Sequence, residues 1–175
     1  MQTKIASEVN SFLSFRIGTE IFAVDVKNVL NILEMTQITK LPKAPDFLKG
    51  VISHRDKVLP VIDSRLKFDM EEEEITTTTC IIVFELNSSG TLINVGAVVD
   101  AVKEVLEIEN NEIMQVPSIG KYHNIDFLQG MYKTDEGFVL ILDIEKVLVT
   151  EEILNIQQIA EKIDKTTLKT EKAKS

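Results

Sequence analysis

Few residues of this chain are of the types that usually carry out chemistry. The sequence contains two histidines, His54 and His123, and one cysteine, Cys80. The tripeptide His54-Arg55-Asp56 also occurs in the catalytic loop of protein kinases, where the aspartate acts as a base and a following asparagine helps to hold magnesium. Here no asparagine follows in the same segment, and the chain has no glycine-rich phosphate loop. The tripeptide therefore does not predict a kinase.

The other candidate chemical groups stand alone in the sequence. No nucleophile lies beside His54, which we expect in an exposed turn, and His123 falls in a loop-like stretch and is expected at the surface. Cys80 opens an apolar strand, where a buried and inert thiol is typical, and one cysteine forms no internal disulfide. The carboxylates of residues 71–74 lack the alternating spacing of a calcium loop, so we expect a solvated loop there. These residues predict no catalytic site, no cofactor and no metal centre.

Composition limits the class of protein. The chain has 175 residues, of which 44% are hydrophobic and 27% are charged, which is typical of a folded globular protein. The net charge is −9; residues 165–175 carry +3, so the rest carries −12. A surface of that sign disfavours nucleic acids and anionic membranes as partners. No apolar run reaches the roughly 18 residues of a membrane span, and the first residues lack a signal peptide's apolar core, so we expect a cytoplasmic protein.

Strand patterns dominate the sequence. Residues 12–17 and 21–24 predict a hairpin that Gly18-Thr19-Glu20 closes. Asp25 is a typical N-cap, and the residues behind it predict a short helix with one apolar face, formed by Val26, Val29, Leu30 and Leu33.

Further hairpins follow along the chain. The proline-containing stretch 41–45 predicts a loop, and residues 50–53 and 57–63 predict a second hairpin around His54-Arg55-Asp56. After the polar break at 71–79, residues 80–86 and 92–99 predict a third hairpin.

An internal repeat is the most informative pattern. Residues 26–32 match residues 102–108 at five of seven positions, 76 residues further on. Residues 47–50 recur as 127–130 and residues 60–63 as 140–143, both at an offset of 80. Two copies in the same order predict a duplicated small β module.

The repeat predicts how the chain is divided. We expect subdomain 1 at about 10–70 and subdomain 2 at about 79–149, followed by a C-terminal helix over 150–164 and a flexible basic tail over 165–175. A module of this size is marginally stable alone, so the two copies should share an apolar seam. The candidate seam residues are Val26, Val29, Val102 and Val105. The apolar stripe of the C-terminal helix is Ile153, Ile156, Ile159 and Ile163, and we expect it to pack on the chain's own strands.

Several motifs resemble those of the CheW family of bacterial chemotaxis adaptors. The resemblance rests on Phe47-Leu48-Lys49-Gly50-Val51-Ile52-Ser53-His54-Arg55 and on Val58-Leu59-Pro60-Val61-Ile62-Asp63-Ser64-Arg65. Flanking pieces fall in the family's order: residues 22–26, 41–45, 95–100 and 141–148. Residues 10–155 are accordingly interpreted as one CheW-like domain.

The resemblance implies a fold and a function. The fold is mainly β: two SH3-like five-stranded β-barrels that share a hydrophobic seam, with short helices and a C-terminal helix. The function is that of a non-catalytic adaptor, which couples the regulatory domain of the histidine kinase CheA to the cytoplasmic tips of chemoreceptors. Neither a cofactor nor a small-molecule substrate is implied, and the protein would be recruited to receptor arrays at the inner face of the membrane. The alternative is a CheW-like scaffold in a non-chemotactic or CheV-type kinase system.

The resemblance also implies contact residues. Receptor contact is expected at Arg55, Val26, Leu30, Val98 and Val99, and kinase contact at Val29, Leu41 and Gly50.

The turn that contains Arg55 departs from the family pattern. It reads Ser53-His54-Arg55-Asp56 where the family usually has Asn-Leu-Arg-Gly. Asp56 suits a turn that needs a positive φ, because aspartate adopts that conformation more readily than most residues. Ser64 replaces the usual leucine before Arg65.

Overall fold

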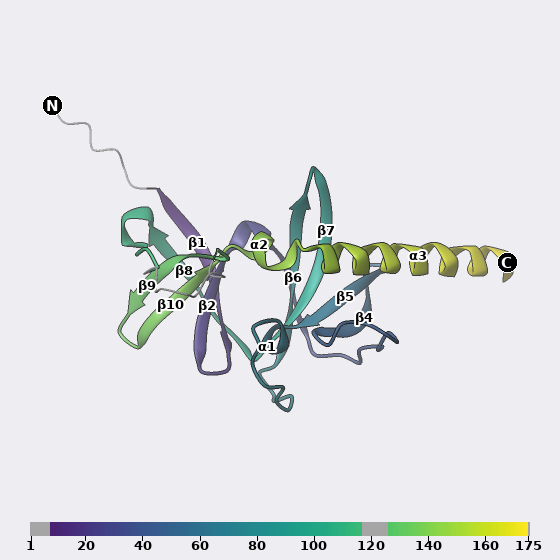
Figure 1. The fold of residues 1–175 in the computed structure, drawn as a ribbon, viewed down its shortest axis with the longest axis horizontal. Helices are drawn as coiled ribbons and strands as arrows, with labels where there is room; N and C mark the ends of the chain where they lie inside the picture. Colours follow the sequence, from purple (N-terminus) through teal and green to yellow (C-terminus); the bar gives the residue numbers. More distant parts are fainter. Residues whose placement is uncertain (1–7, 117–125, 175) are drawn as a thin grey trace.

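Two five-stranded sheets make up most of the molecule (Figure 1). The computed structural model describes residues 8–116 and 126–174. Sheet A has the order β8-β1-β2-β10-β9, and sheet B has the order β3-β6-β7-β5-β4. This confirms the predicted mainly β fold with two five-stranded units. Sheet A consists of β1 (Val9–Ile17), β2 (Glu20–Asp25), β8 (Ala101–Glu109), β9 (Leu128–Thr134) and β10 (Gly137–Leu142). Sheet B consists of β3 (Val29–Glu34), β4 (Leu48–His54), β5 (Lys57–Asp63), β6 (Cys80–Ser88) and β7 (Thr91–Val99).

Each sheet combines a hairpin from one half of the chain with three strands from the other half. The β1–β2 hairpin pairs with β8 on one side and, in parallel, with β10 on the other. The β6–β7 hairpin pairs in the same way with β3 and, in parallel, with β5. The two sheets are therefore equivalent, as the repeat requires, but they do not coincide with the contiguous segments 10–70 and 79–149 expected as subdomains. The chain crosses between the sheets after β2 and again after β7, so each repeat contributes to both.

The first crossing corrects one prediction. The stretch after Asp25 was expected to form a short helix, but it forms a single 3₁₀ turn, η1 (Val26–Asn28), and then enters β3. The Asp25 carboxylate does cap the turn, since its Oδ1 accepts from the backbone N–H of Lys27 at 2.9 Å. A short apolar run fits a helix and a strand equally well, and here pairing with β6 selects the strand.

The described residues form three apolar clusters in the interior. One lies within sheet A and includes Phe12 and Ile108; a second lies within sheet B and includes Leu59 and Ile81. The largest joins the two sheets and is the expected seam, although different residues form it. It includes Phe15, Phe22, Val24, Ile82, Phe84, Leu86, Ile153 and Ile156.

Aromatic rings connect the two sheets across the seam. The ring centroid of Phe22 lies 6.1 Å from that of Phe15 and 5.3 Å from that of Phe68, which follows α1 (Ser64–Lys67). Phe127, just before β9, lies 5.7 Å from Phe68. Phe68 thus packs between two rings of the sheet A side and ties α1 to that sheet.

The predicted seam valines only border this cluster. Val29 and Val102 are partly buried against it, whereas Val26 and Val105 are 37% and 54% exposed.

The C-terminal helix packs on sheet B. After α2 (Ile144–Leu148), α3 (Glu151–Lys174) lies along β5 and projects past the strands (Figure 1). Among residues 151–163 of this helix, the buried ones are Ile153, Ile156 and Ala160, which confirms packing on the chain's own strands, while Ile159 is 48% exposed. The helix runs on to Lys174, so the segment 165–175 expected as a flexible tail is helical up to that residue. No helix among residues 8–116 and 126–174 is both long and apolar enough to cross a bilayer.

Candidate interaction surfaces

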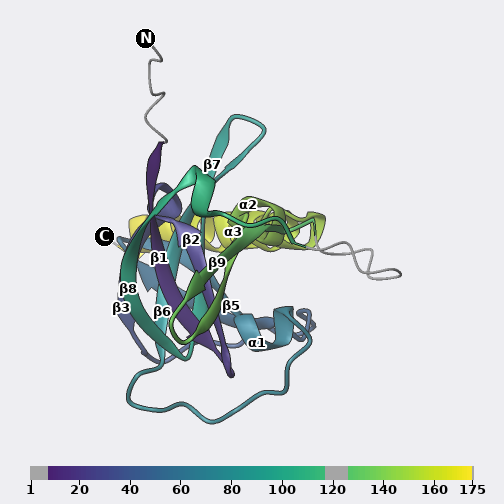
Figure 2. The same cartoon turned by 90° about the vertical axis from the view of Figure 1, so that its left-hand side faces the viewer.

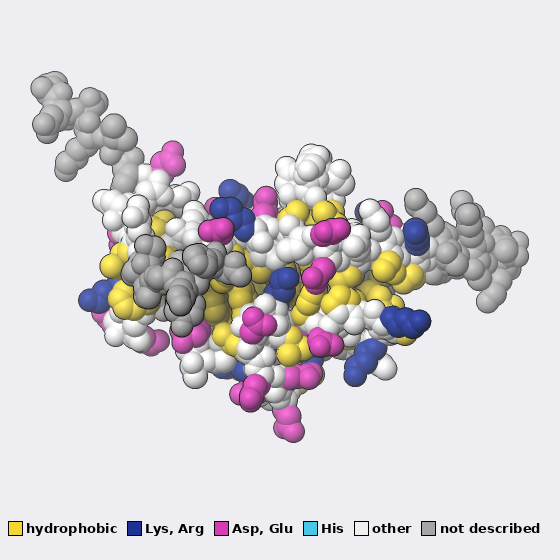
Figure 3. Space-filling model, viewed as in Figure 1, with side chains coloured by type: hydrophobic (Ala, Val, Ile, Leu, Met, Phe, Trp, Pro, Cys, Tyr) yellow, Lys and Arg dark blue, Asp and Glu magenta, His cyan; other side chains and the backbone are white. Residues whose placement is uncertain are grey.

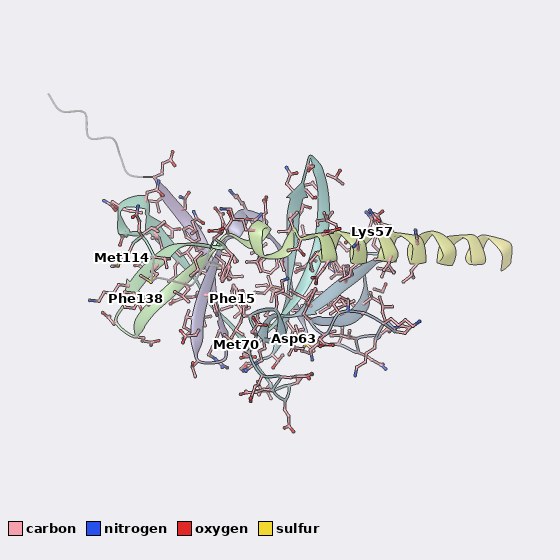
Figure 4. The ribbon with its side chains drawn as sticks, viewed as in Figure 1. Phe15, Lys57, Asp63, Met70, Met114 and Phe138 are labelled. Atoms are coloured by element: carbon pink, nitrogen blue, oxygen red, sulfur yellow. The ribbon has the colours of Figure 1, made fainter. Side chains whose placement is uncertain are left out.

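The β4–β5 turn presents Arg55 to solvent. Arg55 and Asp56 have φ angles of +52° and +62°, the pattern of a two-residue type I′ turn. This confirms that Asp56 occupies a position requiring positive φ. His54 and Lys57 form the last pair of the hairpin, and Lys57 lies beside α3 (Figure 4). The turn therefore holds the Arg55 side chain on a rigid hairpin tip.

A groove of about 630 Å³ runs from this turn to α3. We call it the turn groove. It brings Arg55 and Leu30, both predicted to contact the receptor, to one site. Its other lining residues are His54, Asp56, Lys57, Val58, Leu59, Glu85, Leu92, Asn94, Gln157 and Glu161. Leu92 is 63% exposed and gives the groove an open apolar wall.

The other three predicted receptor contacts do not join the turn groove. Val26 is exposed on η1, after the first crossing. The side chains of Val98 and Val99 are 8% and 1% exposed, inside the sheet B cluster and the seam respectively. Val99 cannot touch a partner without rearrangement of the core, whereas Val98 also lines a small pocket beside Arg65 and Asp100.

A second groove, of about 520 Å³, contains Leu41. We call it the loop groove, since the loop between β3 and β4 forms much of it. It is also lined by Leu48, by Leu66 of α1 and by Ile75 of the segment that follows α1.

The remaining predicted kinase contacts lie outside the loop groove. Val29 is partly buried at the edge of the seam. Gly50 is buried, and a Cβ there would lie 2.1 Å from the carbonyl oxygen of Thr39. The observed role of Gly50 is therefore to let residues 38–39 cross β4, where Thr39 bridges to Val51.

An ion-pair network lies between the two sheets. Arg65 Nε donates to Asp100 Oδ1 at 3.0 Å, and Arg65 Nη2 donates to Asp100 Oδ2. Asp100 follows β7 at the second crossing, and its Oδ2 also accepts from the N–H of Gly18 in the β1–β2 turn at 2.6 Å. The hydrogen bond to Asp100 raises the pKa of Arg65 above its ordinary value, against the opposing effect of burial. The network thus fixes α1 and the second crossing to the turn of sheet A.

This network is not apparent from the sequence, because Arg65 and Asp100 stand 35 positions apart and belong to separate motifs. The one signal in the sequence was that a residue of opposite charge follows closely after each of two apolar strands, Arg65 after β5 and Asp100 after β7.

The band between the sheets is the most apolar part of the face shown in Figure 3. Hydrophobic side chains gather there and below α3, with Asp and Glu side chains around them. Among the partly buried members of the seam are Leu41, Phe47 and Phe127. Such a surface suits protein contact.

In the part of the chain that the structure describes, no group of side chains is arranged for metal binding or acid–base chemistry. No three His, Cys, Asp or Glu side chains there are grouped to hold a metal. His54 is half-buried rather than exposed, and its Nε2 has no hydrogen-bond partner among the described residues. Cys80 is half-buried, and burial raises its pKa, which disfavours the reactive thiolate. His123 lies outside the described residues.

Comparison with known proteins gives a consistent result. A family model described as the CheW-like domain matches residues 11–152. The chain is 31% identical over 160 residues to "Chemotaxis protein CheW" of Klebsiella aerogenes, covering 90% of this chain and 94% of that protein. It is 30% identical over 140 residues to the same-named protein of Rhizobium meliloti, covering 80% and 88%. The solved structure of the scaffolding protein TtCheW from Thermoanaerobacter tengcongensis superimposes with a TM-score of 0.71 at 28% identity, over 83% of this chain and 96% of that one. Together with the duplicated strand order, these matches show that the chain belongs to the CheW family of chemotaxis scaffold proteins.

Proposed function

We propose that this protein is a non-catalytic adaptor that holds the histidine kinase CheA and the cytoplasmic tips of chemoreceptors together, so that receptor state controls kinase activity. It would act on the cytoplasmic side, within receptor arrays at the inner face of the membrane. Its membership of the CheW family supports the proposal, and so does the contact chemistry of its grooves.

One observation carries the proposal furthest: the two grooves lie at opposite ends of one hairpin. The turn groove uses residues 54–59 of β4, β5 and their turn, and the loop groove uses Leu48, Lys49 and Asp63 at the other end. Each of the two strands has seven residues, which spans about 20 Å. Two partners can therefore bind without collision, and a rigid element links them. An adaptor needs that arrangement, because coupling requires both partners to be bound at once.

The two grooves suit different partners. A receptor tip is a bundle of helices, and a groove with an apolar wall receives a helix face through residues at i, i+3 and i+4. Leu30 and Leu92 give the turn groove such a wall among mostly polar lining residues. We assign the receptor to the turn groove, with Leu30 as an apolar contact and Arg55 as an exposed cation and donor. The kinase regulatory domain is assigned to the loop groove, through Leu41.

The remaining predicted contacts take supporting roles in this proposal. Val98 and Val99 would hold the strands beneath the receptor site, and Val29 and Gly50 would hold the loop groove in shape. Val26 would form a separate exposed contact.

The proposal is tested by binding measurements with each partner alone and with both. We expect Arg55→Glu to weaken receptor-tip binding at least tenfold and to leave CheA binding unchanged. We expect Leu41→Glu to weaken CheA binding at least tenfold and to leave receptor-tip binding unchanged. Competition between the two partners for one site would contradict the proposal. Binding of CheA with no receptor binding would favour the alternative, a CheW-like scaffold of another kinase system.

A further inference from the structure

The segment between α1 and β6 forms ion pairs with Lys49 and Arg65, and each of these two cations also has a second carboxylate partner outside the segment. Figure 2 shows this segment as a long loop at the foot of the molecule. We call residues 71–79 the strap. We propose that Lys49 and Arg65, beside the loop groove that the proposed function assigns to the kinase, bind an acidic, partly apolar segment of that partner, and that the strap occupies this site in the free chain. The choice of partner rests on the proposed function.

Lys49 forms ion pairs with two carboxylates, one buried (the inner partner) and one exposed (the outer partner). Its Nζ lies 3.7 Å from Asp63 Oδ2 and 3.7 Å from Glu72 Oε1. The side chain of Asp63 is 6% exposed and that of Glu72 is 64% exposed. Asp63 is also fixed by its own role, since its Oδ1 accepts from the N–H of Arg65 at the start of α1. The inner partner therefore holds the cation in place, and the outer one is free to exchange with solvent or another acid.

Arg65 repeats this arrangement. Its inner partner is Asp100, whose side chain is 17% exposed. Its outer partner is Glu73, whose Oε2 accepts from Nη2 at 3.1 Å and whose side chain is 67% exposed. Exposed ion pairs stabilise a fold little, so replacing Glu73 by a carboxylate of another chain has a low cost.

The apolar part of the site is the loop groove. Lys49 lines it together with Leu41, Leu48 and Leu66, and with Ile75 of the strap. Ile75 is 57% exposed, so it borders the groove without being buried in it. An occupant therefore needs neighbouring carboxylates for the two cations and an apolar residue close behind them. The strap itself has this pattern in Glu72, Glu73 and Ile75.

The strap can leave the groove while its ends stay attached. Before the acidic run, the N–H of Met70 donates to the carbonyl oxygen of Arg65 at 2.7 Å. After it, Thr78 Oγ1 donates to the carbonyl oxygen of Asp100 at 2.8 Å.

The repeat supplies an internal comparison. Eighty residues further on, the positions of Lys49 and Arg65 are held by Gln129 and Glu145, whereas Asp63 recurs as Asp143 and caps α2. Sheet A therefore keeps the aspartate without the two cations. Sheet B has both, which fits the binding of acidic groups in addition to the structural pairing of Arg65 with Asp100.

The test uses a peptide of residues 70–77 as the probe and the full chain carrying E72Q and E73Q as its target. In NMR titrations we expect the peptide to shift the amide signals of Leu41, Lys49 and Arg65. Binding should be about tenfold tighter than to the wild type, whose strap competes. The matched control is E71Q with E74Q, which removes the same charge from the strap but leaves the two ion pairs, and it should behave as the wild type.

Two further results bear on the proposal. Adding Lys49→Gln to the E72Q/E73Q chain should weaken peptide binding at least tenfold. Raising the salt concentration to about 0.5 M should weaken peptide binding to the E72Q/E73Q chain by a similar factor. Equal affinity for the wild type and the E72Q/E73Q chain, or shifts confined to other surfaces, would overturn it. Because the measurement includes neither kinase nor receptor, its outcome is independent of the proposed adaptor function.

Discussion

Gly50 and Gly130 occupy equivalent places in the two sheets, 80 residues apart, and both are overlaid by another segment of the chain. A Cβ on Gly50 would lie 2.1 Å from the Thr39 carbonyl oxygen, and one on Gly130 would lie 2.4 Å from Ile113 Cγ2. Next to each glycine, an isolated β-bridge joins the overlying segment to the edge strand of the sheet. Thr39 bridges to Val51 of β4, and Met114 bridges to Met131 of β9. The repeated motif that contains these glycines thus closes the open edge of each sheet.

The first prediction concerns Gly50→Ala. The new methyl group would collide with backbone, which cannot move aside as a flexible side chain can, so we expect a loss of about 3 kcal/mol in the free energy of unfolding. Gly90→Ala is the matched control. Gly90 also has a positive φ, +87°, but no atom lies within 4 Å of its Cβ position, so only the backbone strain of about 1 kcal/mol should appear. Urea denaturation measures both, and equal losses would contradict the account.

The second prediction concerns the network between the sheets. Asp100→Asn weakens the pairing of Arg65, whose side chain is only 12% exposed, so we expect a loss of about 2 kcal/mol. Glu73→Gln removes the exposed partner of the same arginine and should change stability by less than about 0.5 kcal/mol. Chemical denaturation of both variants provides the comparison. A larger effect for Glu73→Gln would show that the network is anchored at the strap instead.

The third prediction concerns α3. Ile156 is 4% exposed, so Ile156→Ala should lower the free energy of unfolding by about 3 kcal/mol. Ile159, only three residues away, is 48% exposed, and its replacement by alanine should cost less than about 1 kcal/mol. Truncation after Val149 should lower the melting temperature. An unchanged melting curve for the truncated chain would exclude α3 from the core.

The fourth prediction concerns Cys80 and pH. Burial raises the pKa of its thiol in the folded state, so the folded chain binds more protons than the unfolded chain in alkaline solution. Stability should therefore fall as the pH rises through the unfolded thiol's pKa of about 8.5. The same shift should make the thiol react with a disulfide reagent at least about tenfold more slowly in the folded chain than in urea. A Cys80→Ser variant should lose the pH effect at this site. Equal reaction rates in the two states would contradict this account.

The hairpins were predictable because their signals are local, and the duplication because its two copies can be compared directly along the sequence. Alternating strands around Gly18-Thr19-Glu20 or His54-Arg55-Asp56 identify a hairpin without knowledge of the rest of the fold. Likewise, the C-terminal helix begins where it was expected, at Thr150, whose Oγ1 accepts from the N–H of Ile153.

The division of the chain between the sheets was not predictable in the same way. It depends on the parallel pairing of β2 with β10, in which Ile21 lies opposite Val139, 118 positions away. No local pattern distinguishes this pairing from one within the same repeat. The prediction of a helix after Asp25 was wrong for a related reason. Its apolar residues also fit a strand, and pairing with the distant β6 selects the strand.

The candidate site was predictable only in part. Arg55 could be placed from its turn, and its convergence with Leu30 requires β3 to lie in sheet B beside β6. Val98 and Val99 are as apolar as any contact residue, and only their burial reveals that they belong to the interior. Apolar type alone does not separate a core residue from an exposed contact.

Reconstitution of kinase control tests the central claim most directly. The protein is titrated into CheA and receptor-bearing membranes, and kinase autophosphorylation is followed for the wild type, for Arg55→Glu and for Asp135→Arg. Asp135 holds the position equivalent to Arg55 in the β9–β10 turn, so the control inverts a charge on the other sheet. The account predicts stimulation that needs both protein and receptor, that Arg55→Glu abolishes and that Asp135→Arg retains. Stimulation without receptor, or full stimulation by Arg55→Glu, would contradict it.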